Sequence, residues 1–345
     1  MLKLILSEMK NLLILILAIA IASCGNSKKN KESESKKMNI AAAGATFPLP
    51  FYNLAFKTYQ EKTGNTVTYG GIGSGGGIRS LKDKIVDFGG SDAYLSDAEM
   101  QEMPYATVHI PTCMGAVVMA YNLPEVKELK LSGEVVADIY LGKITKWNDA
   151  KIQELNPGVT LPDKELTPVY RSDGSGTTFV FSDYLTKVSN DWKENVGTGK
   201  SLKWPVGLAA KGNPGVAGTI SQTPGAIGYV GSEYAFSLNI PMAQMKNSSG
   251  NFITPNTESI SAAAKGEIPA DTRTMITNSS APDAYPISCF TWIILYKEQA
   301  YANRSLAQAQ ALTTKVHYSP LPQSAVANAK TLLNSISFEG KKVLN

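Results

Sequence analysis

The chain has 345 residues, of which 43% are hydrophobic and 18% are charged, and its formal net charge is +4 at pH 7. This balance is ordinary for a globular protein, and the basic residues do not cluster on any one expected helix, which argues against nucleic-acid binding. The length exceeds that of a usual single hydrophobic core and predicts two domains.

Residues 1–23 are predicted to form an export signal. Lys10 precedes an apolar run at 12–21, which is too short to cross a bilayer as a helix. Because Met9 stands directly before this basic start, we expect translation to begin there rather than at Met1. The mature protein is therefore expected to lie outside the cytoplasm.

The signal ends in Ile21-Ala22-Ser23-Cys24, which resembles the lipobox of bacterial lipoproteins. The resemblance implies that Cys24 becomes the lipidated, palmitate-bearing N-terminus and anchors the protein in a membrane. The alternative is a plain secretory signal with an incidental cysteine. Residues 24–37 are charged and lack large apolar side chains beyond the cysteine, so they are predicted to be a flexible tether.

From residue 38 onward the pattern alternates between strands and helices. Strands are expected at 39–43, 66–69, 86–89, 114–121 with Ile110, 167–170, 226–230 and 285–296. Helices are expected at 48–62, 75–84, 96–103, 132–141, 147–155, 178–188, 216–222, 258–265, 306–317 and 324–336. This series of βαβ units predicts an α/β fold with a mainly parallel sheet. The segment 240–285 is expected to consist of loops around its single helix.

Four strand-to-helix turns, at 43–48, 71–77, 87–92 and 171–177, are rich in glycine and hydroxyl side chains. Backbone N–H groups at such turns can bind an anion, and turns of an open α/β sheet gather at the carboxyl ends of its strands. Arg171 adds a permanent planar cation suited to a tetrahedral oxyanion. The alternative for the last turn is a plain polar loop with a serine cap.

Motifs for other chemistries are incomplete. Residues 71–76 match a dinucleotide fingerprint, but the preceding strand alternates instead of being continuously apolar. The stretch 197–201 ends like a phosphate-binding loop, but Glu194 stands where that loop needs glycine. His109 and His317 have no metal-ligand spacing. Without a nucleophile, base or metal cluster, we expect no enzyme, no cofactor and no metal.

Short motifs follow one another in order between residues 42 and 337. They are Gly44-Ala-Thr-Phe-Pro48, Gly71-Ile-Gly-Ser74, Val86-Asp-Phe-Gly89 with Ser91-Asp92, Ile139-Tyr-Leu-Gly-Lys-Ile144 with Lys146-Trp147, Arg171 with Asp173-Gly-Ser-Gly-Thr177, Val196-Gly-Thr-Gly199 with Lys203-Trp-Pro205, and Pro224-Gly-Ala-Ile-Gly-Tyr229. Together they resemble the phosphate-binding proteins of bacterial phosphate ABC transporters.

The resemblance implies a two-lobed, type II periplasmic-binding-protein fold, with a ligand cleft between lobes joined by two crossing strands. Lobe 1 would comprise 38–120 plus 289–345, and lobe 2 would comprise 121–288. The phosphate-binding residues it implies are Thr46, Phe47, Ser74, Asp92, Arg171, Asp173, Ser175, Gly176 and Thr177. Thr46 and Ser74 would donate hydroxyls, Arg171 would pair with the anion, and Asp173 would hold it. Backbone N–H groups would come from Phe47, Ser175, Gly176 and Thr177.

The function that the resemblance implies is high-affinity binding of inorganic phosphate on the periplasmic or cell-surface side of a bacterial membrane. The protein would be a lipid-anchored monomer that delivers phosphate to the permease subunits of an ABC importer with a cytoplasmic ATPase. Two alternatives are a receptor for another tetrahedral oxyanion and an extracellular phosphatase of similar fold. A purely structural surface lipoprotein would not explain four convergent donor turns.

Asp92 favours phosphate over sulfate, because a fully ionised anion offers no proton to a carboxylate. The alternative for Asp92 is a cap on the helix near Ser96. Cys113 and Cys289 fall close to the crossing strands. Their spacing leaves open whether they form a disulfide or are two small buried hydrophobic residues.

Overall fold

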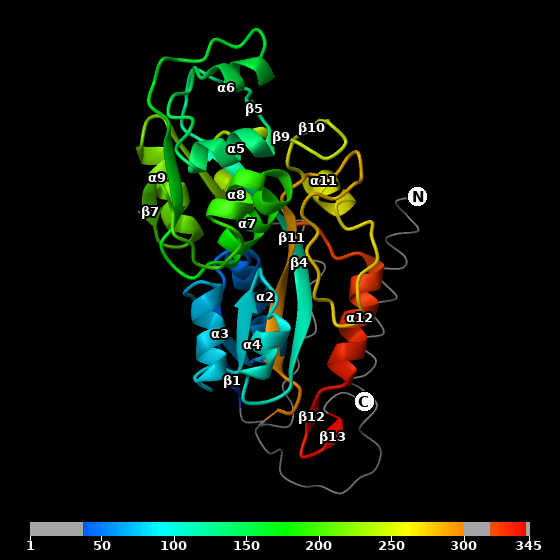
Figure 1. The fold of residues 1–345 in the computed structure, drawn as a ribbon. Coiled ribbons are helices and arrows are strands. Elements are labelled where there is room, and N and C mark those ends of the chain that lie inside the picture. Colours follow the sequence, from blue (N-terminus) through cyan, green and yellow to red (C-terminus); the bar gives the residue numbers. More distant parts are fainter. Residues whose placement is uncertain (1–36, 300–317, 343–345) are drawn as a thin grey trace, which may run out of the picture. The chain divides into compact units, whose positions relative to one another are not determined.

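The computed structural model describes residues 37–299 and 318–342 (Figure 1). Its strands are β1 (Asn39–Gly44), β2 (Thr66–Gly71), β3 (Phe88–Ser91), β4 (Thr107–Tyr121), β5 (Lys130–Leu131), β6 (Thr167–Arg171), β7 (Leu208–Ala210), β8 (Ala226–Gly231), β9 (Gln244–Lys246), β10 (Phe252–Ile253), β11 (Ser288–Tyr296), β12 (Ser337–Phe338) and β13 (Lys341–Lys342). Its helices are α2 (Leu49–Thr63), α3 (Ser74–Lys82), α4 (Asp97–Gln101), α5 (Gly133–Tyr140), α6 (Ala150–Leu155), α7 (Gly176–Val188), α8 (Asn190–Asn195), α9 (Gly212–Gln222), α10 (Ser232–Ser237), α11 (Thr257–Ala262) and α12 (Gln323–Asn334). The predicted signal, Cys24 and the helix expected at 306–317 lie outside the described residues.

Eight strands form one mixed sheet in the order β2-β1-β3-β11-β4-β8-β6-β7. Its first arm (β2, β1, β3) and its second arm (β8, β6, β7) are each parallel. Between them, β11 and β4 run antiparallel to each other and to the adjoining arms. The expected mainly parallel sheet is therefore correct for the arms and wrong for the centre. The centre is antiparallel because β4 carries the chain from the first arm to the second, and β11 brings it back.

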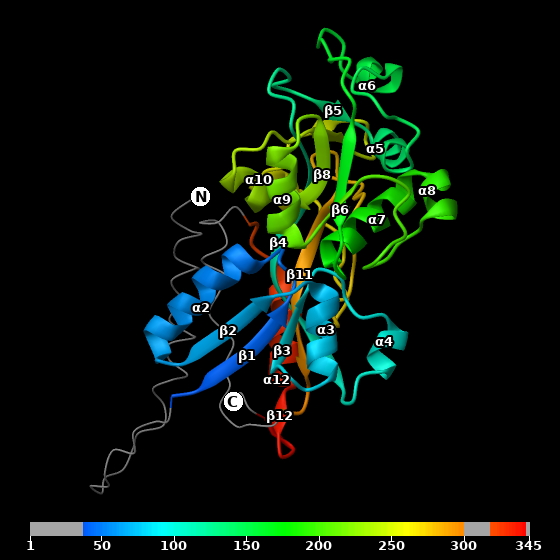
Figure 2. The same ribbon diagram turned by 90° about the vertical axis from the view of Figure 1, so that its left-hand side faces the viewer.

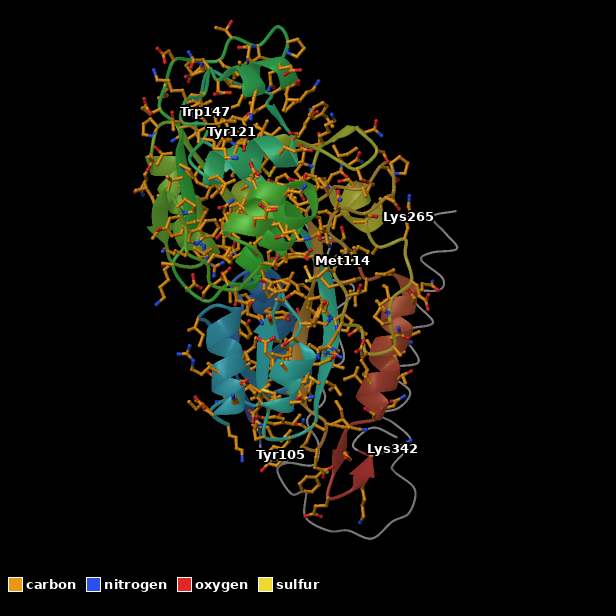
Figure 3. The ribbon with its side chains drawn as sticks, viewed as in Figure 1. Tyr105, Met114, Tyr121, Trp147, Lys265 and Lys342 are labelled. Carbon is orange, nitrogen blue, oxygen red and sulfur yellow. The ribbon has the colours of Figure 1, made fainter. Side chains whose placement is uncertain are left out.

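β4 is the element that joins the two arms. All 15 of its residues are buried, including the polar side chains of Thr107, His109 and Thr112. It pairs with β11 up to Ala116 and with β8 from Val117 onward, so it changes partner within one strand. In Figure 3, Met114 lies between the two groups of elements and Tyr121 lies among the green elements of the second group.

The β4–β11 ladder contains an irregularity next to a proline. The register shifts between Thr291 and Trp292, opposite Pro111, whose missing N–H group cannot support a regular ladder. Further along, Cys113 lies opposite Thr291, and Cys289 lies opposite Gly115. Both cysteines are buried free thiols in this structure, so they act as small apolar side chains, and burial raises the pKa of each well above its ordinary value.

Helices pack on both arms, and an aromatic cluster fixes the helix that begins at the fourth glycine-rich turn. α2 packs on β2, and α3 packs on β1 and β3 (Figure 2). In the second arm, Phe181 of α7 stacks on Tyr229 of β8 with ring centroids 4.3 Å apart. Trp204 stacks on Tyr229 at 5.7 Å. The Tyr229 hydroxyl accepts from the backbone N–H of Arg171 at 3.0 Å, so this cluster also fixes the end of β6.

Most local differences from the expected elements occur in short segments. The helix expected at 147–155 begins only at Ala150, because the Trp147 N–H donates to the Lys164 carbonyl at 3.0 Å and Asp149 caps the helix by accepting from the Lys151 N–H at 2.9 Å. The loop segment 240–285 also contains β9 and β10. The strand β7 and the helices α8 and α10 were not expected. These elements have two to six residues, too few for a periodic pattern to identify them.

Candidate anion-binding site

The four glycine-rich turns meet in the structure, as the sequence predicts. The first three follow or end the strands of the first arm, and the fourth joins β6 to α7 in the second arm. Ala45 of the first turn donates its N–H to the Gly90 carbonyl of the third at 2.8 Å. Gly75 of the second turn donates to the Gly174 carbonyl of the fourth at 2.9 Å. Backbone hydrogen bonds therefore connect loops from the two arms directly.

Two glycines make this close approach possible. Gly73 has φ of +84°, and a Cβ there would lie 2.3 Å from Asp173 Oδ2. A Cβ on Gly176 would lie 2.4 Å from Ser74 Oγ and 2.8 Å from the Asp92 nitrogen. Any side chain at either position would force the loops of the two arms apart.

The hydroxyl groups of Ser74 and Thr46 are buried and each accepts two N–H bonds, which fixes where their hydrogens can go. Ser74 Oγ accepts from the N–H groups of Gly176 at 3.0 Å and Asp92 at 3.4 Å. Thr46 Oγ1 also accepts twice, both times from one residue of α9, which is described below. Because a hydroxyl has two lone pairs and one hydrogen, each oxygen that accepts twice must donate its hydrogen to another acceptor. An anion among these loops would meet hydroxyl hydrogens.

The predicted backbone donors do not all remain available. Ser175 donates its N–H to the Lys200 carbonyl at 2.8 Å, and its Oγ accepts from the Thr178 N–H at 3.0 Å, which caps α7. The cap agrees with the alternative interpretation of this turn as a polar loop with a serine cap. It leaves the hydroxyl hydrogen as the group that Ser175 can donate to an anion. Within the described residues, the N–H groups of Phe47 and Thr177 have no hydrogen-bond acceptor.

Arg171 and Asp173 form the charged pair that the sequence predicts. Arg171 Nε donates to Asp173 Oδ1 at 2.7 Å, and Nη2 donates to Oδ2 at 2.5 Å, so the contact is bidentate. The arginine side chain is only 1% exposed. Burial alone would raise the pKa of Asp173, but the hydrogen bonds and charge of Arg171 outweigh it and lower the pKa. The Gly212 N–H also donates to Asp173 Oδ1, at 3.0 Å.

Asp92 is a buried carboxylate in a site otherwise made of donors. Its Oδ1 accepts from Thr291 Oγ1 at 2.9 Å and its Oδ2 from Thr177 Oγ1 at 3.4 Å. Burial raises the pKa of Asp92 to about 7, against the lowering effects of Thr291, the Arg171 charge and Thr177. Asp92 does not cap the nearby helix: Ser96 caps α4 in a capping box with Glu99. The arrangement suits a tetrahedral oxyanion that carries a proton.

Several residues around the site escaped the sequence interpretation. Asn213 Nδ2 donates to Thr46 Oγ1 at 3.0 Å and to Thr177 Oγ1 at 3.1 Å. The sequence did contain an indication of Asn213, because Gly212-Asn213-Pro214 repeats the glycine and early proline of the first turn. The turn was not identified because the three-residue strand that precedes it, β7, was not expected. Thr291 had no signal, because it lies inside an apolar strand.

Two tyrosines support the first turn through hydrogen bonds to its carbonyl groups. The Tyr234 hydroxyl donates to the Thr46 carbonyl, and the Tyr318 hydroxyl donates to the Phe47 carbonyl. Beside them, Glu233 is buried, and burial raises its pKa to about 8. Its Oε1 has no hydrogen-bond partner in the described part of the chain. The two tyrosine hydrogen bonds hold the backbone at Thr46 and Phe47 in place.

Residues 37–299 and 318–342 contain neither a metal-binding cluster nor a membrane-spanning helix. No cluster of three or more histidine, cysteine, aspartate or glutamate side chains there could hold a metal ion. No helix in those ranges has the length and apolar character needed to cross a bilayer.

The sequence is similar to curated proteins over most of its length. Residues 29–313 match the model of a PBP superfamily domain. Phosphate-binding protein PstS of Pasteurella multocida (strain Pm70) is 41% identical over 302 residues, which cover 83% of this chain and 87% of that protein. Phosphate-binding protein PstS of Methanocaldococcus jannaschii is 35% identical over 295 residues, covering 79% and 76%.

Solved structures share the fold at lower identity. A high-affinity periplasmic phosphate-binding protein bound with phosphate has a TM-score of 0.68 at 21% identity, covering 87% of this chain and 99% of that one. A phosphate-binding protein from Stenotrophomonas maltophilia has a TM-score of 0.64 at 18% identity, covering 85% and 93%. The expected two-lobed, type II periplasmic-binding-protein fold is therefore confirmed.

Proposed function

This chain belongs to the PstS family of phosphate-binding proteins within the PBP superfamily, and we propose that it binds inorganic phosphate for uptake by an ABC transporter. The observation that carries the proposal is the combination of buried donors with one buried acceptor. Arg171 and three hydroxyls surround the place where the turns meet, and Asp92 is the carboxylate among them. Phosphate near neutral pH has oxygens for the donors and a proton for the acceptor.

The proposed binding residues keep the roles that the sequence suggested, except at Ser175 and Gly176, whose N–H groups are bonded within the protein. Thr46 and Ser74 donate hydroxyl hydrogens, Phe47 and Thr177 donate backbone N–H groups, and Arg171 pairs with the anion while Asp173 holds its guanidinium. Ser175 contributes its hydroxyl rather than its N–H, because the N–H is bonded to Lys200. Gly176 contributes by allowing the two arms to approach.

We also propose that the two arms belong to lobes that close on the ligand. Lobe 1 is 38–120 plus 289–345, and lobe 2 is 121–288. The change of partner within β4 supports crossings close to these boundaries. Contacts between the proposed lobes include the Gly75–Gly174 hydrogen bond and an ion pair between Lys200 and Glu99 at 2.6 Å. Such contacts are what a closed cleft requires.

The protein would act outside the cytoplasm, held by lipid on Cys24, and would pass phosphate to permease subunits driven by a cytoplasmic ATPase. The support for the anchor is the Ile21-Ala22-Ser23-Cys24 junction. Cys24→Ser should leave the precursor uncleaved or release the protein from the membrane, as judged by fractionation and mass spectrometry. A variant that remains membrane-bound and is processed as before would contradict lipidation.

Calorimetric titration of the refolded, anion-stripped protein tests the binding function. Phosphate should bind at one site per chain, and sulfate at the same concentration should not bind. Equal binding of sulfate would favour a general oxyanion receptor. Incubation with a chromogenic phosphate ester, with and without divalent metal, tests the phosphatase alternative, which sustained turnover would favour. Absence of any phosphate binding would refute the proposal.

A further inference from the structure

Asn213 lies at the start of α9 and is completely buried. It connects the two arms through the two threonines proposed to bind phosphate. Thr46 Oγ1 accepts from both the backbone N–H and Nδ2 of Asn213, each at 3.0 Å. Thr177 Oγ1 accepts from the same Nδ2 at 3.1 Å. Both amide hydrogens of one side chain are thus used on two hydroxyl oxygens.

A third contact decides which way this amide faces. Asn213 Oδ1 accepts from the Gly231 N–H at 3.0 Å. A backbone N–H can only donate, so the amide oxygen must face Gly231 and the amide nitrogen must face the threonines. The hydrogen-bond partners therefore exclude the flipped amide.

The direction of the amide sets the direction of both hydroxyls. Thr46 Oγ1 receives two N–H bonds from Asn213, which occupy its two lone pairs, so its hydrogen must point elsewhere. Thr177 Oγ1 receives Asn213 Nδ2 and, at 3.4 Å, Arg171 Nη1, and its own hydrogen points toward Asp92 Oδ2. The Thr46 hydroxyl is thereby available to a ligand only as a donor, while the Thr177 hydrogen is directed at Asp92.

We propose that Asn213 is a positioning residue that makes Thr46 an obligatory hydrogen-bond donor to the bound anion and keeps the hydroxyl hydrogen of Thr177 on Asp92. The inference rests on the proposed phosphate-binding function and adds a residue to its site. A hydroxyl that is free to rotate could also turn a lone pair toward the ligand. The Asn213 amide removes that choice before the anion arrives and so prepares the site for oxygens without hydrogen.

Asn213→Asp is the informative substitution because it keeps the size of the side chain and an oxygen for Gly231. A carboxylate can only accept, so the Thr46 hydroxyl would turn its hydrogen toward it and present a lone pair to the anion, and the Thr177 hydroxyl would turn its hydrogen away from Asp92. Phosphate affinity should fall at least 100-fold, or about 2.7 kcal/mol. Asn213→Ala removes the amide without reversing the hydroxyls and should weaken binding by about tenfold. Asn256→Asp is the matched control, since Asn256 caps α11 with an acceptor oxygen that aspartate retains.

A double-mutant cycle with Thr46→Val separates positioning from a structural role. If Asn213 acts through the Thr46 hydroxyl, Asn213→Ala should cost much less in the Thr46→Val background than in the parent. Thermal unfolding of each variant without ligand shows whether it is folded. If Asn213→Ala does not fold, the same cycle is run with Asn213→Asp.

The outcomes distinguish this inference from the proposed function. Additive losses in the cycle, or an Asn213→Asp affinity within threefold of the parent, would overturn the positioning role while phosphate binding by the parent still stands. Failure of the parent to bind phosphate would overturn the proposed function and this inference with it. A loss in Asn256→Asp as large as that in Asn213→Asp would show that the effect is not specific to the site.

Discussion

Replacing Asp92 with asparagine tests why a site for an anion contains a carboxylate. The side chain is 1% exposed, and its oxygens already accept from Thr291 and Thr177. An ionised Asp92 can accept a hydrogen bond from a P–O–H group, whereas sulfate near neutral pH carries no such hydrogen. Asparagine has nearly the same shape, removes the charge, and can donate to an unprotonated oxygen.

The expected change follows from two opposite effects. Loss of the charge-assisted hydrogen bond should weaken phosphate binding by about 1.5–3 kcal/mol, or roughly 10- to 150-fold, offset in part by the removal of a negative charge. For sulfate, the carboxylate is a like charge at close range, worth about 4 kcal/mol at an effective dielectric constant near 20. Removing it should improve sulfate binding by roughly 10³-fold. A site of this kind can prefer phosphate over sulfate by about 10⁴–10⁵-fold, and most of this preference should disappear in Asp92→Asn.

Competition titration of phosphate against sulfate, from pH 6 to pH 8, measures this selectivity. The pKa of Asp92 near 7 means that the carboxyl of the parent becomes protonated as the pH falls below 7. A protonated Asp92 no longer repels sulfate, so sulfate should compete better at pH 6 than at pH 8. Asp92→Asn should show no such pH dependence. If the variant excludes sulfate as strictly as the parent at pH 8, Asp92 is not the selector.

Three other predictions concern the charged pair, closure and a buried acid. Arg171→Ala should weaken phosphate binding by about 1.5–3 kcal/mol or more. Asp173→Asn should weaken it by less, because this change removes only the group that orients the arginine. Calorimetry that shows the reverse order would mean that the roles of the two residues are exchanged. Small-angle scattering should give a smaller radius of gyration with phosphate than without, and identical curves would indicate a rigid cleft. The pKa of Glu233 is raised from 4.5 to about 8, so ionisation of Glu233 lowers the free energy of unfolding. This loss of stability is absent below pH 4.5, grows as the pH rises, and is complete above about pH 8. Glu233→Gln should therefore raise the unfolding midpoint more at pH 8.5 than at pH 5, and an equal shift at both values would contradict the raised pKa.

Local chemistry made much of the fold predictable. The capping box of Ser96 and Glu99 and the cap at Ser175 are interactions within one turn, and both occur as the residues suggest. The order of strands and helices follows from apolar periodicity, which needs about four residues to be recognised in a strand and about ten in a helix. Short elements such as β7 were missed, and with β7 the turn that carries Asn213 was missed too.

The sequence by itself determined the family, the four glycine-rich turns and the residue types that can contact an oxyanion, because these depend on the order of neighbouring residues. Only the tertiary structure decided that β4 changes partner after Ala116, that Thr291 bonds Asp92, and that Asn213 bridges Thr46 and Thr177. Hydrogen-bond direction and pKa depend on partners and burial supplied by distant parts of the chain. No local pattern in the sequence contains that information.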